Sequence, residues 1–132
     1  SPEGQAEAEA AGRWLQEHHL LPDLVLCSPA RRTRETLEAV LGVVGYVDQR
    51  LEPAIYEATA GTLAGLADRH RGTGRLMLVG HNPGLEQLVA LMSSGQTGDY
   101  RGMPPAAVAV LSLPKEATIE PGIAQLAAFW WP

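Results

Sequence analysis

The stretch that decides the fold is Arg75-Leu-Met-Leu-Val-Gly-His-Asn-Pro-Gly84, where a short apolar run leads into polar residues and a helix start. Leu76–Val79 is apolar throughout, as expected for a strand buried on both faces. Asn82 is a favoured N-cap residue, and Pro83 suits the first helical position, where its missing N–H costs nothing. His81 is therefore predicted on a turn where free backbone N–H groups and the helix dipole favour a bound phosphate or carboxylate.

Two earlier helices are predicted to begin in a similar way. Leu24-Val-Leu26 leads through Cys27 to Ser28-Pro29, which predicts Ser28 as the cap of a helix and Pro29 as part of its first turn. Ser1-Pro2 opens another helix in the same way. In an open α/β sheet, ligands bind outside the carboxyl ends of the strands, so two such turns on neighbouring strands would place two helix N-termini around one crevice. Taken alone, each cap is also an ordinary feature of a helix start.

The rest of the chain alternates helices with strands. The apolar pattern predicts helices over residues 2–19, 29–43, 62–70 and 83–93, strands over 23–27, 75–80, 107–113 and 123–131, a short extended piece at 45–47 and a loop at 93–105. Such alternation implies a parallel sheet between two layers of helices, closed by two late strands that can pair with each other. We expect one α/β domain over residues 1–132, a three-layer α/β/α sandwich with a mostly parallel central sheet.

Composition restricts the classes of partner. The 132 residues, 45% of them apolar, carry ten basic and fifteen acidic side chains, for a net charge of −5. The basic residues form no long stripe, which argues against a nucleic-acid partner. No apolar run reaches the roughly 20 residues of a membrane span, and no leader pattern opens the chain. Cys27 is the single cysteine, so no internal disulfide forms; we expect a buried small hydrophobe there and a reducing, cytoplasmic location.

Several catalytic classes have no support in the sequence. The histidines are His18, His19, His70 and His81, with no HxxxH pair and no second cysteine, so we expect no metal site. No GxSxG motif is present to indicate a serine hydrolase. No GxGxxG or Walker motif indicates nucleotide binding. The sequence therefore predicts neither a metal nor an organic cofactor.

Successive segments of the chain resemble landmarks of the histidine phosphatase superfamily. They are Ser1-Pro-Glu-Gly4, Cys27-Ser-Pro-Ala-Arg-Arg-Thr-Arg-Glu-Thr-Leu37 and Leu78-Val-Gly-His-Asn-Pro83. The compact layout and the segment Met103-Pro-Pro-Ala-Ala-Val-Ala-Val-Leu111 resemble the SixA-like phosphohistidine phosphatase branch, so the resemblance covers nearly the whole chain. It implies a phosphoglycerate mutase-like fold without a cap domain, and a phosphohydrolase that acts through a phosphohistidine intermediate without a metal or cofactor.

The resemblance also implies roles for individual residues. His81 matches the family's second active-site histidine, which holds the phosphoryl oxygens and the charge that grows on them. Arg32 matches the phosphate-clamping arginine of the Ser-Pro-x-x-Arg pattern, whereas the helical wheel alone leaves both Arg31 and Arg32 off the apolar stripe. Glu57 lies where some relatives keep an acidic residue; it is a candidate proton donor, with a surface carboxylate as the alternative. Fixed donors of these types stabilise the charge on a phosphoryl group during transfer.

The family's nucleophilic histidine belongs to an Arg-His-Gly triplet at the end of a central strand, and residues 1–132 contain no such triplet. We expect the native polypeptide to begin earlier, with the strand that carries this histidine, because its neighbours would otherwise have unpaired backbone groups. A non-catalytic, phosphate-binding relative is the alternative. The loops after Tyr46 and Ser93 are short and leave an open site. This favours phosphohistidine on a signalling protein as the substrate, with a small phosphorylated metabolite as the alternative.

Overall fold

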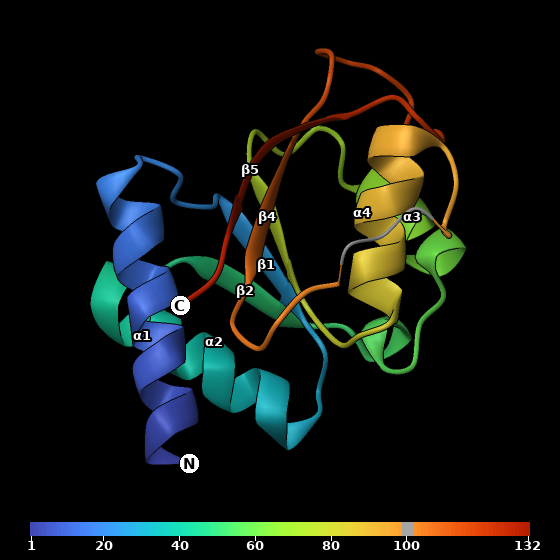
Figure 1. Ribbon diagram of the computed structural model, residues 1–132. Coiled ribbons are helices and arrows are strands. Elements are labelled where there is room, and N and C mark those ends of the chain that lie inside the picture. Colours follow the sequence, from blue (N-terminus) through green and yellow to red (C-terminus); the bar gives the residue numbers. More distant parts are fainter. Residues whose placement is uncertain (99–101) are drawn as a thin grey trace.

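The computed structural model describes residues 1–98 and 102–132 (Figure 1). Most helices and strands begin and end within a residue or two of the predicted positions. The short extended piece lies at 48–51 instead of 45–47. Residues 99–101 of the predicted loop lie outside the described ranges. The elements follow in the order α1 (Pro2–Glu17), β1 (Leu24–Cys27), α2 (Arg31–Val44), β2 (Asp48–Leu51), the 3-10 turn η1 (Pro53–Ile55), α3 (Ala60–Arg69), β3 (Leu76–Val79), α4 (Gly84–Ser94), β4 (Val108–Ser112) and β5 (Gln125–Trp130).

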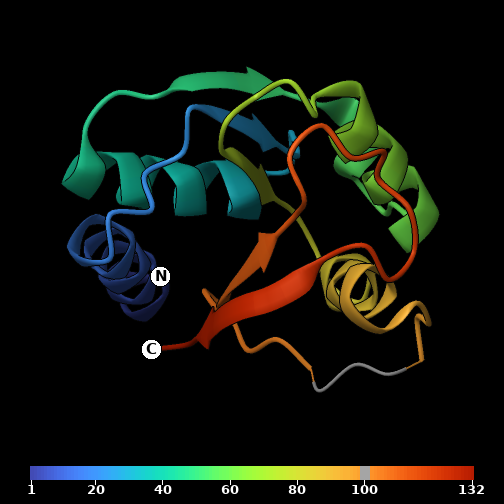
Figure 2. The same cartoon turned by 90° about the horizontal axis from the view of Figure 1, so that it is seen from above.

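Strands β2, β1 and β3 form a parallel sheet with β1 in the centre. Strands β4 and β5 pair antiparallel, which confirms the predicted pairing of the two late strands. Figure 2 shows all of these strands across the molecule in the order β2, β1, β3, β4, β5. In the described ranges no backbone pairing joins β3 to β4, so the hairpin and the parallel sheet are separate sheets that lie side by side.

Alternate residues of the central strand β1 face the two helical layers, as the period of a strand requires. Leu24 and Leu26 pack with residues of η1, α3 and α4, whereas Val25 and Cys27 pack on the other side with α2. Helix α1 in turn packs on α2. The predicted three-layer α/β/α sandwich is thus confirmed, and Figure 2 shows α1 and α2 on one side of the sheet and α3 and α4 on the other.

Two local predictions are also confirmed. The Ser1 side chain accepts a hydrogen bond from the Gly4 N–H at 3.1 Å, so it caps α1 as its sequence indicates. Cys27 is a free cysteine with no exposed surface, as expected for a small buried hydrophobe. Among the helices that the structure describes, none combines the length and the apolar content needed to cross a bilayer.

Candidate active site

The turns after β1 and β3 meet at one edge of the sheet, which we call the carboxyl edge. The two strands are parallel and in register, with Cys27 opposite Val79 at their ends. The Ser28 N–H donates to the Val79 carbonyl at 3.0 Å and ties the first turn to the end of the neighbouring strand. His81 follows β3 on the second turn, and helices α2 and α4 begin just beyond (Figure 1). The structure therefore brings the two predicted turns together.

Two neighbours hold the His81 ring. Its Nε2 lies 2.8 Å from Ser28 Oγ. The Tyr56 ring meets it edge-on, with 5.5 Å between ring centroids. The imidazole itself is half-buried, and its Nδ1 makes no hydrogen bond to any residue of the described ranges. One ring nitrogen is thus engaged by the protein, and the other is available to a ligand.

The prediction that Ser28 caps α2 is wrong. The helix begins at Arg31 with Ala30 as its N-cap, and no side chain of residues 1–98 or 102–132 caps its first turn. Ser28 is fully buried and its hydroxyl pairs with His81, while the Ala30 N–H reaches the same oxygen only at 3.4 Å. The partner is 53 residues away in the sequence, so local capping patterns could not reveal it. A consequence is that the first N–H groups of α2 lack a side-chain acceptor and are free to bind an anion.

The predicted start of α4 is also wrong by one residue. The helix begins at Gly84 with Pro83, not Asn82, at the N-cap. The Asn82 amide carbonyl still accepts from the Glu86 N–H at 3.2 Å, but its NH2 group donates to the Met103 carbonyl at 2.8 Å. Glu86 accepts from the Met103 N–H at 3.0 Å. These long-range bonds, which no local pattern shows, fasten the segment before β4 to the start of α4, beside His81.

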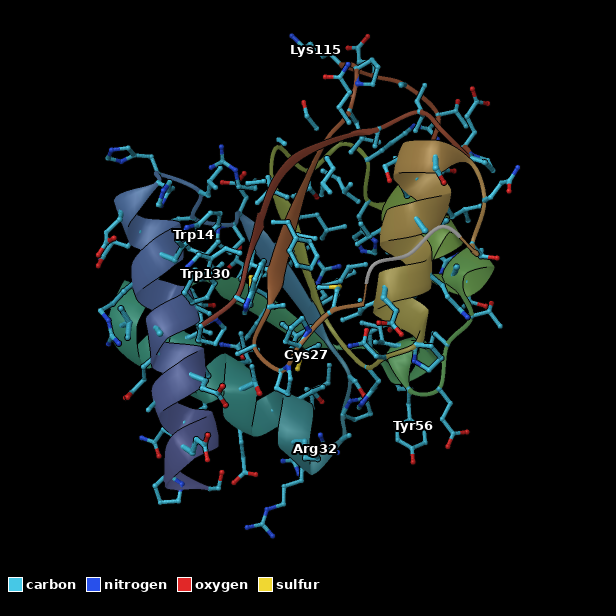
Figure 3. The ribbon with its side chains drawn as sticks, in the orientation of Figure 1. Trp14, Cys27, Arg32, Tyr56, Lys115 and Trp130 are labelled. Atoms are coloured by element: carbon cyan, nitrogen blue, oxygen red, sulfur yellow. The ribbon has the colours of Figure 1, made fainter. Side chains whose placement is uncertain are left out.

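The three arginines at the start of α2 differ in their partners. Arg31 pairs with Glu35 at 3.6 Å, and Arg34 donates from Nε to the Pro29 carbonyl at 2.9 Å. The Arg32 side chain is exposed and has no partner among the residues that the structure describes. Figure 3 shows Arg32 at the same end of the molecule as Tyr56, the residue that contacts His81. No hydrogen bond joins Arg32 to His81. The two side chains would therefore reach a ligand at this edge from two sides, Arg32 from the start of α2 and His81 from the turn before α4.

Glu57, the predicted candidate for proton donor, lies next to the residue that contacts His81. Its side chain is exposed and its backbone has a left-handed φ of 53°. The structure brings Tyr56, not Glu57, into contact with His81. Sequence reasoning missed Tyr56 because it lies outside the predicted helices and strands, where no periodic signal marks an aromatic residue, and its partner is distant in the chain.

The remaining histidines lie at the opposite edge of the sheet. His18 and His19 follow the end of α1 and lead toward the start of β1, and His70 ends α3 before β3. Within residues 1–98 and 102–132, no three His, Cys, Asp or Glu side chains are grouped closely enough to hold a metal ion. Only His81 of the four histidines therefore belongs to the carboxyl edge.

Cys27 is adjacent to the site but is not suited to act as a nucleophile. Burial raises the pKa of its thiol, although a hydrogen bond with Thr33 and the positive charge of Arg34 partly oppose this. The protonated thiol lies 3.3 Å from the Ser28 carbonyl and donates to it. Since the thiolate is the reactive form, a raised pKa leaves Cys27 as a structural residue.

Gly84 packs so closely against the backbone at Ala58 that a side chain at position 84 is predicted to destabilise the fold. A Cβ atom at position 84 would lie 2.5 Å from the Ala58 carbonyl oxygen, which is backbone and cannot swing away. Gly84→Ala is expected to lower the free energy of unfolding by about 1–3 kcal/mol, the usual cost of overpacking. Urea denaturation of the variant and the wild type measures the difference.

The matched control for this measurement is Gly42→Ala in α2, where nothing lies within 4 Å of the added Cβ. This change is expected to stabilise the fold by about 0.4–1 kcal/mol, because alanine has less conformational freedom in the unfolded chain. Equal midpoints for Gly84→Ala and the wild type would show that the start of α4 and the segment at Ala58 are not tightly packed together.

Comparison with known proteins places these features in a family. A family model described as the histidine phosphatase superfamily, branch 1, matches residues 1–73. An uncharacterized protein of Mycobacterium tuberculosis is 33% identical over 141 residues, a match that covers 100% of this chain and 87% of the relative. The candidate phosphohistidine phosphatase SixA of Agrobacterium tumefaciens is similar in structure, with a TM-score of 0.84 and 27% identity over 100% of this chain and 82% of that one. A structure of the protein histidine phosphatase SixA with tungstate has the same fold, with a TM-score of 0.85 at 20% identity over 99% and 82% of the two chains.

Proposed function

Because this chain belongs to the histidine phosphatase superfamily, in its SixA-like branch, we propose that the protein removes phosphate from phosphohistidine on a signalling protein. The observation that carries the proposal is the meeting of His81 with the turn that leads into α2. Near this edge lie an imidazole, a guanidinium without a partner in the described ranges, and a helix N-terminus that no described side chain caps. These are the groups that a phosphoryl dianion needs.

Each of these groups would interact with the phosphoryl group in its own way. His81 donates a hydrogen bond to a phosphoryl oxygen and stabilises the charge that develops on it during transfer. Arg32 binds two phosphoryl oxygens through its fork of N–H donors. The free N–H groups at the start of α2 add fixed dipoles, which stabilise the same charge without having to reorganise. Glu57 is the candidate proton donor to the leaving group.

The openness of the carboxyl edge supports a protein as the substrate. Tyr56, in contact with His81, is 55% exposed, and Arg32 and Glu57 are exposed beside it. A phosphorylated side chain on the surface of another protein can reach such a site, whereas a small metabolite is usually enclosed by a deeper pocket. Buried free Cys27 is consistent with a reducing, cytoplasmic location for this reaction.

We infer that the nucleophile is a histidine on a further strand, ahead of Ser1 in the native polypeptide, that pairs between β3 and β4. Support comes from β3, whose residues are all apolar and which pairs with β1 along one edge only in the described ranges. Leu76, Met77 and Leu78 are partly exposed, although parallel strands of this composition are normally buried. A strand on this edge would end at the carboxyl edge, close to His81.

The reaction then proceeds in two balanced steps. The nucleophilic imidazole nitrogen forms a bond to phosphorus while the bond from phosphorus to the substrate imidazole breaks, and the leaving nitrogen takes up a proton. Water then attacks the phosphorus of the enzyme-bound phosphohistidine, which releases inorganic phosphate and restores the histidine.

The experiment that tests this function uses the full-length protein with a phosphohistidine-containing protein labelled with radioactive phosphate. Rapid quenching in alkali is expected to trap labelled phosphate on the enzyme, in a form that acid releases, because phosphorus bonded to an imidazole nitrogen is acid-labile. The label should appear before inorganic phosphate accumulates and should disappear when the substrate is exhausted.

Two further measurements make the result decisive. N-terminal sequencing and intact mass of the native protein are expected to reveal an Arg-His-Gly triplet ahead of Ser1, and residues 1–132 alone are expected to be inactive. Activity of residues 1–132 alone would show that the nucleophile is assigned to the wrong segment. A native protein that carries the triplet but neither hydrolyses phosphohistidine nor traps phosphate would refute the proposed function.

A further inference from the structure

We propose that Ser28 is a positioning residue that fixes the tautomer of His81, so that in the neutral ring the hydrogen is on Nδ1. The inference concerns the described residues alone, and only its effect on turnover rests on the proposed function. It goes beyond the local sequence pattern, which predicts Ser28 as a helix cap, and beyond the roles that the family resemblance implies for His81, Arg32 and Glu57. The inference rests on the 2.8 Å contact between Ser28 Oγ and His81 Nε2.

The direction of this hydrogen bond follows from the surroundings of the serine hydroxyl. Ser28 has no exposed surface, so its hydroxyl hydrogen cannot be donated to solvent. Within the described ranges the oxygen has two polar neighbours, the Ala30 N–H at 3.4 Å and His81 Nε2. The first is itself a donor and cannot accept. Because a buried donor without an acceptor is costly, the hydroxyl donates to Nε2, which must then be the unprotonated nitrogen of the neutral ring.

The backbone of Ser28 is fixed by three further hydrogen bonds, which prevent the serine from turning away. Its N–H donates to the Val79 carbonyl at 3.0 Å. Its carbonyl accepts from Thr33 Oγ1 at 2.8 Å and from the Cys27 thiol at 3.3 Å. Both donors are buried, so water does not compete for these bonds. The hydroxyl is thus presented to His81 from a rigid position at the end of β1.

The consequence for the site is a choice between the two ring nitrogens. With Nε2 accepting from Ser28, the neutral imidazole has its N–H on Nδ1, the nitrogen without a partner among the described residues. A phosphoryl oxygen is an acceptor and needs a donor opposite it. Ser28 therefore keeps the ligand-facing nitrogen as a donor even when His81 is uncharged. When the ring is protonated, the serine oxygen can accept instead.

The first test is a long-range 1H–15N correlation spectrum of the full-length protein at about pH 8.5, where an ordinary imidazole is neutral. The His81 signals are identified by their loss in His81→Gln. We expect the wild-type ring to be in the Nδ1–H form. Ser28→Ala is expected to shift it toward the Nε2–H form, and Ser28→Thr, which keeps a hydroxyl, to retain the Nδ1–H form. A wild-type ring in the Nε2–H form overturns the inference, whether or not the variants fold.

The second test is kinetic and separates positioning from a general loss of stability. Ser28→Ala is expected to lower kcat about 10- to 100-fold, the same scale as the loss of an outer hydrogen-bond partner from a metal-bound histidine. KM should change less, because the oriented donor matters most as charge develops. Ser28→Thr should recover much of the loss, and Ser112→Ala, which removes an exposed serine at the end of β4, should turn over normally.

The two tests distinguish failure of this inference from failure of the proposed function. An Nδ1–H ring that responds to Ser28→Ala in a protein without phosphatase activity would leave the positioning role intact and refute the phosphatase. An active phosphatase in which Ser28→Ala changes neither the tautomer nor kcat would refute the role of Ser28 alone.

Discussion

Replacing His81 by alanine is expected to lower kcat for phosphohistidine hydrolysis about 100- to 1000-fold, the usual effect of removing one donor to a developing oxyanion. The imidazole has one nitrogen engaged by Ser28 and the other available to a phosphoryl oxygen. Its removal therefore takes away an interaction that strengthens as charge grows in the transition state. Single-turnover rates of the full-length protein, with the trapped phosphoenzyme followed over time, measure the effect.

The control for this prediction is His18→Ala. His18 is exposed at the end of α1, which lies at the other end of the molecule from the starts of α2 and α4 (Figure 1). We expect its kcat to equal that of the wild type. Circular dichroism and thermal melting of both variants verify that each is folded. A folded His81→Ala variant with wild-type turnover would remove His81 from the catalytic machinery.

Arg32→Ala is expected to lower kcat/KM roughly 100-fold, again on the scale of one lost donor. The guanidinium is exposed and makes no hydrogen bond or ion pair within the described ranges, so its substitution should cost almost no folding free energy. Arg32→Lys should restore only part of the activity, because an ammonium group cannot bind two phosphoryl oxygens in the fork geometry. Steady-state kinetics together with urea denaturation separate the catalytic effect from any loss of stability.

Arg31→Ala is the matched control, since it removes a neighbouring arginine that pairs with Glu35 on the solvent side of α2. Both partners are more than half exposed, so the pair should contribute little to stability. We expect Arg31→Ala to retain activity within a few-fold of wild type. The small loss would come only from a weaker long-range attraction of the negatively charged substrate. Equal losses in the two variants would mean that the site responds to net charge and not to a specific clamp.

Much of the architecture was predictable because it depends on periods that are local in the sequence. The apolar run at residues 23–27 indicated a strand, and alternate residues of β1 do pack into different layers. The apolar pattern over residues 29–43 indicated a helix, and α2 lies over nearly the same residues. Short-range rules also predicted the cap of α1 by Ser1. In each case the signal is a residue pattern that spans a few neighbours in the chain.

The candidate site was predictable only in part. His81 was expected at the end of a strand and Arg32 at the start of a helix, and both lie at the carboxyl edge. The proximity of Tyr56 and the fastening of Met103 by Asn82 and Glu86 were not expected. They join segments that lie far apart in the sequence and carry no repeating pattern.

The amino-acid sequence by itself determined the succession of strands and helices, the burial of Cys27, the position of His81 just beyond a strand and the position of Arg32 at the start of a helix. Local hydrophobic period and turn chemistry are sufficient for these. Only the tertiary structure decided the role of Ser28. As a residue before Pro29 it has the form of a helix cap, but its hydroxyl is buried against an imidazole 53 residues away. A buried hydroxyl must bond to whichever polar group the fold brings within reach, and that partner is determined by the pairing of β1 with β3.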